Sequence, residues 1–274
     1  TTTGMFYGGL ASTTNYNRVT RINSSGTLIG SETNVGTARN YLAGVGLGTT
    51  GVFYGGTTSL NKVITNYNRV TRINSSGTLI GSETNVGTAR YGVAGAGLGT
   101  TGVFYAGYNA ATKRVTRINA SGALIGSETN VGTARAYLAG VGLGTTGVFY
   151  GGLSYPTVYN RVTRINASGV LIGSETNVGT ARADLAGAGL GTTGVFYNGI
   201  VTRINASGVL IGSETNVGTA RNGVAGAGLG TTGVFYAGYN AATKRVTRIN
   251  ASGALIGSET NVGTARGYLA GAAL

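Results

Sequence analysis

This sequence contains few side chains that could act on a substrate. There is no Cys and no His, and the seven acidic residues comprise Asp184 and one Glu in each copy of a repeat. A general acid and a general base need two groups held in different environments. Equivalent Glu residues specify no such pair, so the sequence predicts a protein that is not an enzyme.

Sites for a metal or a cofactor find no support either. Without Cys and His, the usual thiolate and imidazole ligands are missing. The Gly-rich segment Gly44 to Gly46 recurs in each repeat with the alternation of a β-strand, which makes it weak evidence for a phosphate-binding loop. We therefore expect no metal and no cofactor.

Arginine carries most of the formal net charge of +13. One Arg ends each Gly-Thr-Ala-Arg segment, and these residues are Arg39, Arg90, Arg135, Arg182, Arg221 and Arg266. In a closed ring of repeats they would surround the axis and could bind a carboxylate, sulfate or phosphate. They could equally bond carbonyl groups of the next repeat, and the sequence leaves both alternatives open.

A second set of charges lies in two neighbouring segments of each repeat. A β-branched segment carries Arg, and the segment after it carries Glu32, Glu83, Glu128, Glu175, Glu214 or Glu259. If the two segments are adjacent strands, each Glu can pair with an Arg across the hairpin. We expect this structural role for the Glu residues rather than a role in binding a ligand.

The elements that position these residues follow from the repeat. The Gly-Thr-Ala-Arg segments recur about every 45 residues, a period typical of four-stranded propeller blades. In one repeat, apolar and turn patterns predict strand a at Leu42 to Leu47, strand b at Val52 to Tyr54 and strand c at Arg69 to Asn74. Strand d is expected between Thr78 and Asn85.

Joining the two termini completes the last repeat. Leu269 to Leu274 followed by Thr1 to Gly9 aligns with Leu42 to Gly56 without a gap. An open solenoid or array of hairpins has no reason to close in this way, whereas a propeller removes exposed strand edges by closure. The sequence therefore predicts an all-β protein, a six-bladed β-propeller of four-stranded antiparallel blades, with the C-terminal strand a pairing with the N-terminal strands b to d.

We expect residues 1–274 to form a single propeller domain. Because the sequence starts at Thr1 and not at Met, we expect it to be processed or excised from a longer protein. No apolar run reaches the roughly 20 residues that span a bilayer, so we expect no transmembrane segment.

The repeats resemble those of kelch-type propellers. Thr37 to Arg39 and its copies match the short kelch segment before strand a, and a double Gly follows strand b at Gly8-Gly9, Gly55-Gly56 and Gly151-Gly152. The sequence departs from the kelch pattern at Ala106-Gly107, Asn198-Gly199 and Ala237-Gly238, in Ile22 where kelch repeats often have Tyr, and in lacking the strand d Trp. The repeats are also similar to kelch-like segments of bacteriophage tail and fibre proteins.

Differences among the near-identical repeats cluster in two places. These are the residue pair after each Gly-Thr-Ala-Arg segment and the loop between strands b and c, which is longest at Thr57 to Asn68 and at Leu153 to Tyr159. Both should emerge on one face of an up-and-down blade, and loops on a rigid scaffold commonly carry recognition. Neutral drift in exposed loops would give the same pattern.

The variable face is rich in Tyr, which offers contact area and a hydroxyl group at a small entropic cost. The ligand-binding candidates on this face are Tyr41, Tyr67, Tyr91, Tyr108, Tyr137, Tyr155, Tyr159, Asp184, Tyr239 and Tyr268. They are the residues on which we expect recognition to depend.

The resemblance to phage fibre segments implies a virion surface domain that recognises a host-surface glycan or protein and assembles with other virion proteins. The basic charge would suit an acidic polysaccharide. Dispersed basic groups and the lack of a known motif argue against nucleic acid as a partner. The alternative is a structural module that decorates or assembles a larger particle.

Overall fold

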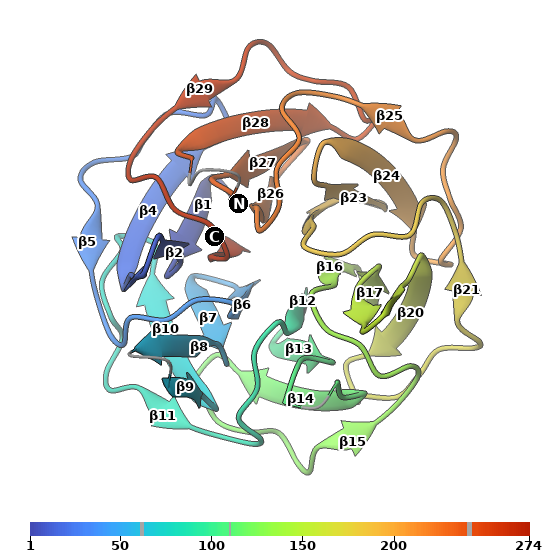
Figure 1. Cartoon of the computed structure of the whole chain (residues 1–274), viewed down its shortest axis with the longest axis horizontal. Helices are drawn as coiled ribbons and strands as arrows, with labels where there is room; N and C mark the ends of the chain where they lie inside the picture. Colours follow the sequence, from blue (N-terminus) through green and yellow to red (C-terminus); the bar gives the residue numbers. More distant parts are fainter. Residues whose placement is uncertain (61–62, 110, 240–242) are drawn as a thin grey trace.

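The computed structural model describes residues 1–274 except 61–62, 110 and 240–242. Its regular elements are β-strands, and six four-stranded antiparallel sheets surround a central axis (Figure 1). The predicted six-bladed β-propeller is confirmed. The described part of the chain contains no helix long and apolar enough to cross a bilayer.

Strand a of each blade lies nearest the axis. These strands are β30 (Ala270–Ala273), β6 (Ala43–Leu47), β12 (Ala94–Leu98), β16 (Ala139–Leu143), β22 (Ala186–Leu190) and β26 (Ala225–Leu229). Gly alternates with apolar residues in five of them, and β30 has Ala273 in the place of the second Gly. A Cβ atom at Gly46 would overlap the carbonyl group of Ala273 on the neighbouring blade. Glycine therefore allows the inner strands to approach as closely as this ring requires.

Strands b and c carry the bulk of the core. Strand b is β1 (Thr3–Tyr7), β7 (Thr50–Tyr54), β13 (Thr101–Tyr105), β17 (Thr146–Tyr150), β23 (Thr193–Tyr197) and β27 (Thr232–Tyr236). Strand c is β4 (Arg18–Asn23), β10 (Arg69–Asn74), β14 (Arg114–Asn119), β20 (Arg161–Asn166), β24 (Ile200–Asn205) and β28 (Arg245–Asn250). Phe53 and Ile73 of one blade pack with Met5 and Tyr7 of the preceding blade, so the core lies between blades.

Strand d is much shorter than the sequence predicted. It is β5 (Thr33–Asn34), β11 (Thr84–Asn85), β15 (Thr129–Asn130), β21 (Thr176–Asn177), β25 (Thr215–Asn216) and β29 (Thr260–Asn261). Leu79 forms only an isolated bridge with Ile73. Gly81 then adopts a φ of 63°, which takes the backbone out of the extended conformation and interrupts the expected strand.

The ring closes as predicted. β30 pairs with β1 in an antiparallel register that places Gly4 opposite Ala273, so the first blade has the order β30-β1-β4-β5. Both termini lie at the inner side of the ring (Figure 1). The two ends of the chain therefore share one sheet.

The blades create two faces of different character. The loop face holds the links from strand d to the next strand a together with the b–c loops, and the turn face holds the a–b and c–d turns. Isolated bridges join several links to the b–c loop of the blade that the link enters, as between Asn40 and Thr57. These links and loops therefore lie side by side. The prediction that the variable segments share one face is confirmed.

Among the residues that the structure describes, three b–c loops form hairpins of their own on the loop face. These hairpins pair β2 (Leu10–Ala11) with β3 (Thr14–Asn15), β8 (Thr57–Leu60) with β9 (Val63–Asn66), and β18 (Leu153–Ser154) with β19 (Thr157–Val158). The predicted long loop from Thr57 to Asn68 includes residues 61–62, which lie outside the described part of the chain. The hairpins belong to the first, second and fourth blades, so the loop face lacks the symmetry of the scaffold.

The close approach at the axis can be tested at Gly46. Gly46→Ala should lower the free energy of unfolding by about 2 kcal/mol or more, because the new methyl group would overlap the backbone of β30. Gly48→Asn is the control, since no atom lies within 4 Å of a Cβ there and Asn accepts the left-handed φ of 62°. Denaturant unfolding should show a far smaller loss for the control, and equal losses would contradict the steric explanation.

Candidate functional site

The six arginines of the Gly-Thr-Ala-Arg segments lie inside the molecule, between adjacent blades. Arg39, Arg90, Arg135 and Arg266 are fully buried, and Arg182 is the most exposed at 7%. Each guanidinium group lies 3.1 to 3.8 Å from the Glu of the blade that its link enters. The pairs are Arg39–Glu83, Arg90–Glu128, Arg135–Glu175, Arg182–Glu214, Arg221–Glu259 and Arg266–Glu32.

Arg39 shows how such a residue joins two blades. Its Nη1 lies 3.1 Å from Oε1 of Glu83, and its Nη2 donates to the hydroxyl group of Thr71 at 2.7 Å. On the other side, the guanidinium carbon lies 5.6 Å from the ring centroid of Tyr7, which belongs to the preceding blade. The Tyr7 hydroxyl donates to the carbonyl of Thr37 at 2.8 Å. One side chain thus bonds the following blade and packs on the preceding one.

This geometry corrects the expectation of an exposed anion-binding ring at Arg39, Arg90, Arg135, Arg182, Arg221 and Arg266. Of the two alternatives, bonding to the neighbouring blade is what the structure shows, and carboxylates and hydroxyl groups take part in addition to carbonyls. A buried guanidinium needs a counter-charge, and the Glu of the next blade supplies it. These arginines are positioned to hold the ring together.

The six glutamates have a matching structural role. Five of them also pair across the hairpin with an outer arginine of strand c, at Arg18, Arg69, Arg114, Arg161 and Arg245. This confirms the predicted pairing for those blades. In the fifth blade Ile200 occupies the position of the outer arginine, and among the described residues Arg182, at 3.8 Å, is the one cation that pairs with Glu214.

The pKa of these carboxyl groups reflects their bonding. Burial alone would raise the pKa of Glu128, but hydrogen bonds from Thr116 and Thr88 and the charge of Arg90 lower it to about 2. Glu259 is lowered to about 2 against the same effect of burial, chiefly by hydrogen bonds from Thr247 and Thr219. These carboxylates stay ionised at neutral pH and suit an ion pair better than proton transfer.

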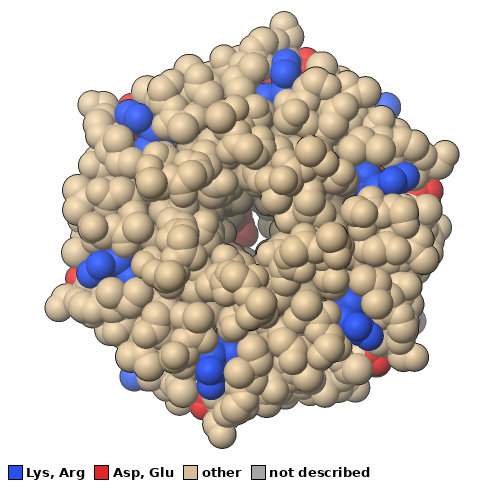
Figure 2. Space-filling model, turned by 180° about the vertical axis from the view of Figure 1, so that it is seen from behind, with Lys and Arg blue, Asp and Glu red and all other residues tan. Residues whose placement is uncertain are grey.

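The remaining strand c arginines account for the charge of the turn face. Arg21 approaches the c–d turn of the next blade, with Nη1 3.5 Å from the carbonyl oxygen of Ser75. Its equivalents are Arg72, Arg117, Arg164, Arg203 and Arg248. Within the described residues none of the six forms an ion pair with a carboxylate. Basic side chains gather at six places around the central opening (Figure 2).

A closed ring of backbone hydrogen bonds surrounds the axis on the loop face. The second residue after each Gly-Thr-Ala-Arg segment donates its amide to the carbonyl of its counterpart in the previous link, at 2.8 to 3.0 Å. In order, the ring consists of Tyr41, Gly92, Tyr137, Asp184, Gly223 and Tyr268. All six have a positive φ between 54° and 64°. The ring therefore fixes the direction in which each of these side chains leaves the backbone.

The ring brings the predicted tyrosines of the links together. The rings of Tyr41 and Tyr268 stack with their centroids 4.2 Å apart, and Tyr137 meets Tyr41 edge-on at 5.4 Å. Tyr91 lies next to Tyr41 at 5.9 Å. Two further candidates extend this axial tyrosine cluster outward, because Tyr108 contacts Tyr91 and Tyr239 contacts Tyr268.

Other predicted ligand-binding residues lie apart from the cluster. The ring of Tyr67 lies beneath Arg69 and the ring of Tyr159 lies beneath Arg161. Both tyrosines come at the end of their b–c loop, just before strand c. Tyr155 is 91% exposed on the fourth-blade hairpin. The structure thus divides the predicted tyrosines between the axial cluster and the outer parts of the b–c loops.

A groove opens beside the axial cluster, between the hairpins of the first two blades. It has a volume of about 350 Å³. Its lining residues are Leu10, Ser12, Thr13, Asn40, Tyr41, Thr57, Ser59, Ile64, Tyr91 and Tyr137. Ile64 is 63% exposed although it is aliphatic. The groove combines aromatic and aliphatic surface with hydroxyl and amide groups, as pockets for uncharged polar ligands do.

Several groove residues were not among the sequence candidates. Nothing in the sequence pointed to Leu10, Ser12 or Thr13, which come from the first-blade hairpin. The signal that could have found them is the length of the first b–c loop compared with the almost absent loop at Asn198-Gly199.

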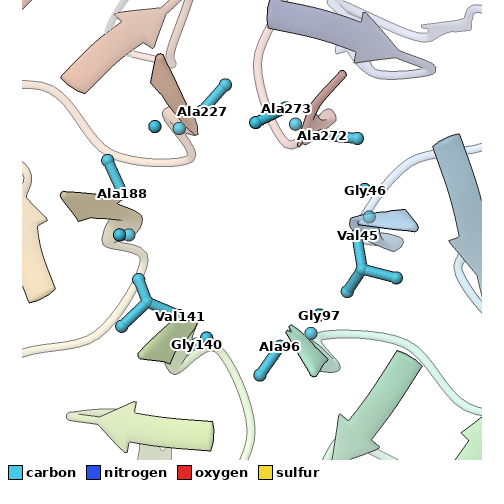
Figure 3. A pocket seen from close by; sticks show the side chains of 18 of the residues that line it. Val45, Gly46, Ala96, Gly97, Gly140, Val141, Ala188, Ala227, Ala272 and Ala273 are labelled. Carbon is cyan, nitrogen blue, oxygen red and sulfur yellow. The ribbon is translucent and has the colours of Figure 1, made fainter. Parts of the chain in front are cut away.

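The axis itself is an open channel walled by strand a. The part nearest the turn face has a volume of about 290 Å³, and its wall includes Val45, Ala96, Val141 and Ala188 (Figure 3). Its wall contains no charged side chain. In the described part of the chain no three His, Cys, Asp or Glu residues lie together as metal ligands would.

No protein-family model matches this sequence, and no curated protein matches it significantly. We therefore infer function from the geometry of the loop face.

The difference between the two arginine partners of Glu128 gives a stability test. Glu128→Gln should lower the free energy of unfolding by about 3 kcal/mol, because Arg90 would remain buried without a counter-charge. Arg114→Gln removes the half-exposed partner of the same carboxylate and should cost about 1 kcal/mol or less. Denaturant unfolding measures both, and a larger loss for Arg114→Gln would contradict this ranking.

The lowered pKa of Glu128 and Glu259 predicts the acid response of the ring. Since the folded-state pKa of about 2 lies below the ordinary value of 4.5, each carboxylate contributes stability above about pH 4.5. That contribution should disappear progressively as the pH falls toward 2. The free energy of unfolding, measured across this pH range, should change less steeply with pH for Glu128→Gln than for the wild type. Identical slopes of free energy against pH would show that Glu128 contributes nothing.

Proposed function

We propose that this propeller is a non-enzymatic binding module that recognises a host-surface glycan or protein through its loop face. The observation that carries the proposal is the groove on the loop face. It is lined by the first two b–c hairpins and by tyrosines of the axial cluster. Its volume of about 350 Å³ suits a ligand of one or a few sugar rings or a short peptide segment.

The chemistry of the groove suits such a ligand. The rings of Tyr41, Tyr91 and Tyr137 offer flat apolar surfaces against which the apolar face of a sugar or a peptide side chain can pack. Thr57 and Ser59 add hydroxyl groups to the lining of the groove. Tyrosine beside small hydroxyl residues is also the composition of adaptable protein-binding loops.

Backbone conformation gives further support. Tyr41, Tyr137, Asp184 and Tyr268 hold a left-handed φ that costs a non-Gly residue about 1 kcal/mol. Gly92 and Gly223 occupy equivalent places in the same ring. The scaffold thus accepts Gly at this position, and the four larger residues carry strain that a role in binding would explain.

From the resemblance of the repeats to kelch-like segments of phage tail and fibre proteins, we propose that this module lies on a virion surface together with other virion proteins. The unpaired turn-face arginines add a positive field that would attract an acidic polysaccharide. Attraction of this kind speeds encounter, whereas the groove would supply selectivity.

A second candidate function is a structural module that assembles or decorates a particle. The six equivalent arginines of the turn face favour it, because a repeated basic surface can dock on an acidic partner without any loop. This candidate requires no affinity of the loop face for envelope material.

Binding of the labelled protein to purified bacterial envelope polysaccharide, at low and high salt, tests the proposal. Tyr91→Ala and Ile64→Ser should each weaken binding about tenfold, because each removes apolar contact surface from the groove. Val158→Ser is the matched control, since Val158 is also exposed on a b–c hairpin but lies outside the groove. We expect the groove-dependent part of the affinity to persist at high salt.

Duplex DNA measured in parallel separates the two candidate functions. Equal binding of DNA and polysaccharide that disappears at high salt, and that is insensitive to the groove variants, would overturn the proposed function. Replacing the turn-face arginines by Gln should then abolish both interactions. That outcome would favour the structural module.

A further inference from the structure

A small cavity lies on the axis inside the backbone ring of the loop face. Its volume is about 90 Å³. The ring residues Tyr41, Tyr137, Asp184 and Tyr268 line it, and aliphatic side chains that begin strand a line the rest, at Leu42, Val93, Leu138, Leu185, Val224 and Leu269. The cavity therefore has one carboxylate, an aromatic wall and an aliphatic base.

Asp184 differs from every other carboxylate of the protein. Each of the six Glu residues has an arginine partner, whereas Asp184 has neither an ion pair nor a side-chain hydrogen bond with any residue that the structure describes. Arg182, two residues away, directs its guanidinium to Thr202 and Asn198 of the next blade. A carboxylate in such a place lacks the counter-charge that buried acids normally have.

The titration of Asp184 agrees with this environment. Burial raises the pKa of its carboxyl group to about 6, and no positive group opposes the effect. The titratable groups nearby are the phenols of Tyr41, Tyr137 and Tyr268, whose own pKa values are raised by burial and by the charge of Asp184. These phenols are uncharged at neutral pH, so the negative charge of Asp184 is uncompensated.

We propose that this axial cavity binds the head group of an organic ammonium ion, with Asp184 as counter-ion and the tyrosine rings as its wall. The inference rests on the proposed binding role of the loop face and names one chemical group that the ligand carries. Aromatic rings attract alkylammonium groups through their electron-rich faces, and a carboxylate beside them adds a direct charge contact.

The composition of the cavity selects an alkylated ammonium group over a metal ion. Calcium or magnesium would need several oxygen ligands, and Asp184 is the only carboxylate here. Leu42, Leu138 and Leu185 instead suit methyl or methylene groups. The cavity volume of about 90 Å³ is several times the volume of one water molecule. A small substituted ammonium group therefore fits.

The two glycines of the ring help to shape this cavity. A Cβ atom at Gly92 would come within 3.1 Å of the Tyr137 ring, and one at Gly223 would overlap the ring of Tyr268. Each glycine thus leaves the space into which a tyrosine ring leans. Six large side chains would fill the axis, whereas three tyrosines, one Asp and two glycines leave room for a guest.

A titration with choline, followed by the NMR signals of the intact protein, tests the inference. Its matched control ligand is 3,3-dimethylbutan-1-ol, in which an uncharged carbon replaces the quaternary nitrogen. We expect choline to bind at about pH 8 and the neutral alcohol to bind at least about tenfold more weakly. Asp184→Asn keeps the size of the side chain and should weaken choline binding by about tenfold or more.

The pH dependence supplies a second readout. Because the acid must be ionised to hold the cation, affinity for choline should fall about tenfold between about pH 8 and about pH 5 in the wild type. Asp184→Asn should show no such change. Denaturant unfolding of the same variant verifies that it remains folded.

Three results would overturn the inference. They are no choline binding by the wild type at about 10 mM ligand, equal binding of choline and the neutral alcohol, or equal affinity of the wild type and folded Asp184→Asn. The polysaccharide assay with the groove variants is independent of this titration. Choline binding without polysaccharide binding would refute the proposed function alone, and the reverse result would refute only the axial ammonium site.

Discussion

A buried ion pair joins every blade of this propeller to the next one. The arginine that ends one blade reaches the glutamate, a threonine hydroxyl and backbone carbonyls of the following blade, and it also packs on a tyrosine of its own blade. Because a desolvated guanidinium without a partner would be strongly destabilising, each pair requires its two blades to lie in register. All six glutamates of the repeat form these ion pairs. The turn-face arginines and Asp184 therefore have no partner of opposite charge in the described structure.

Glycine at the axis and the ion pairs further out act together on the same ring. Gly46 lets the backbone of one inner strand approach that of its neighbour, while Arg39 and Glu83 hold the outer part of the same interface. Between them pack the aromatic residues of strand b, with the ring centroids of Tyr7 and Phe53 5.2 Å apart. Most of these residues recur in near-identical repeats, although Ala273 stands in the place of Gly46 in the first blade. The scaffold is therefore close to symmetric and leaves variation to the loop face.

The features on which the proposed recognition depends lie where that symmetry is broken. Hairpins of unequal length flank one groove, and unequal residues occupy the ring of backbone hydrogen bonds around the axis. A symmetric scaffold thus presents an asymmetric surface, with aromatic rings and hydroxyl groups around the groove and one uncompensated carboxylate in the axial cavity. Loops supported by a rigid framework can vary in this way at little cost to folding.

The sequence by itself determined the fold, the closure of the ring and the division into a constant and a variable face. Period, strand alternation and turn residues are local properties, and near-identical repeats at Leu42 and Leu269 show directly which segments are equivalent. Only the tertiary structure decided where Arg39 points, because sequence spacing places a residue on a link and does not say whether its side chain faces the axis or the next blade. It likewise decided the short strand d after Gly81, and the groove, whose walls come from different blades. Contacts between distant segments depend on packing geometry, and that geometry is absent from any local pattern.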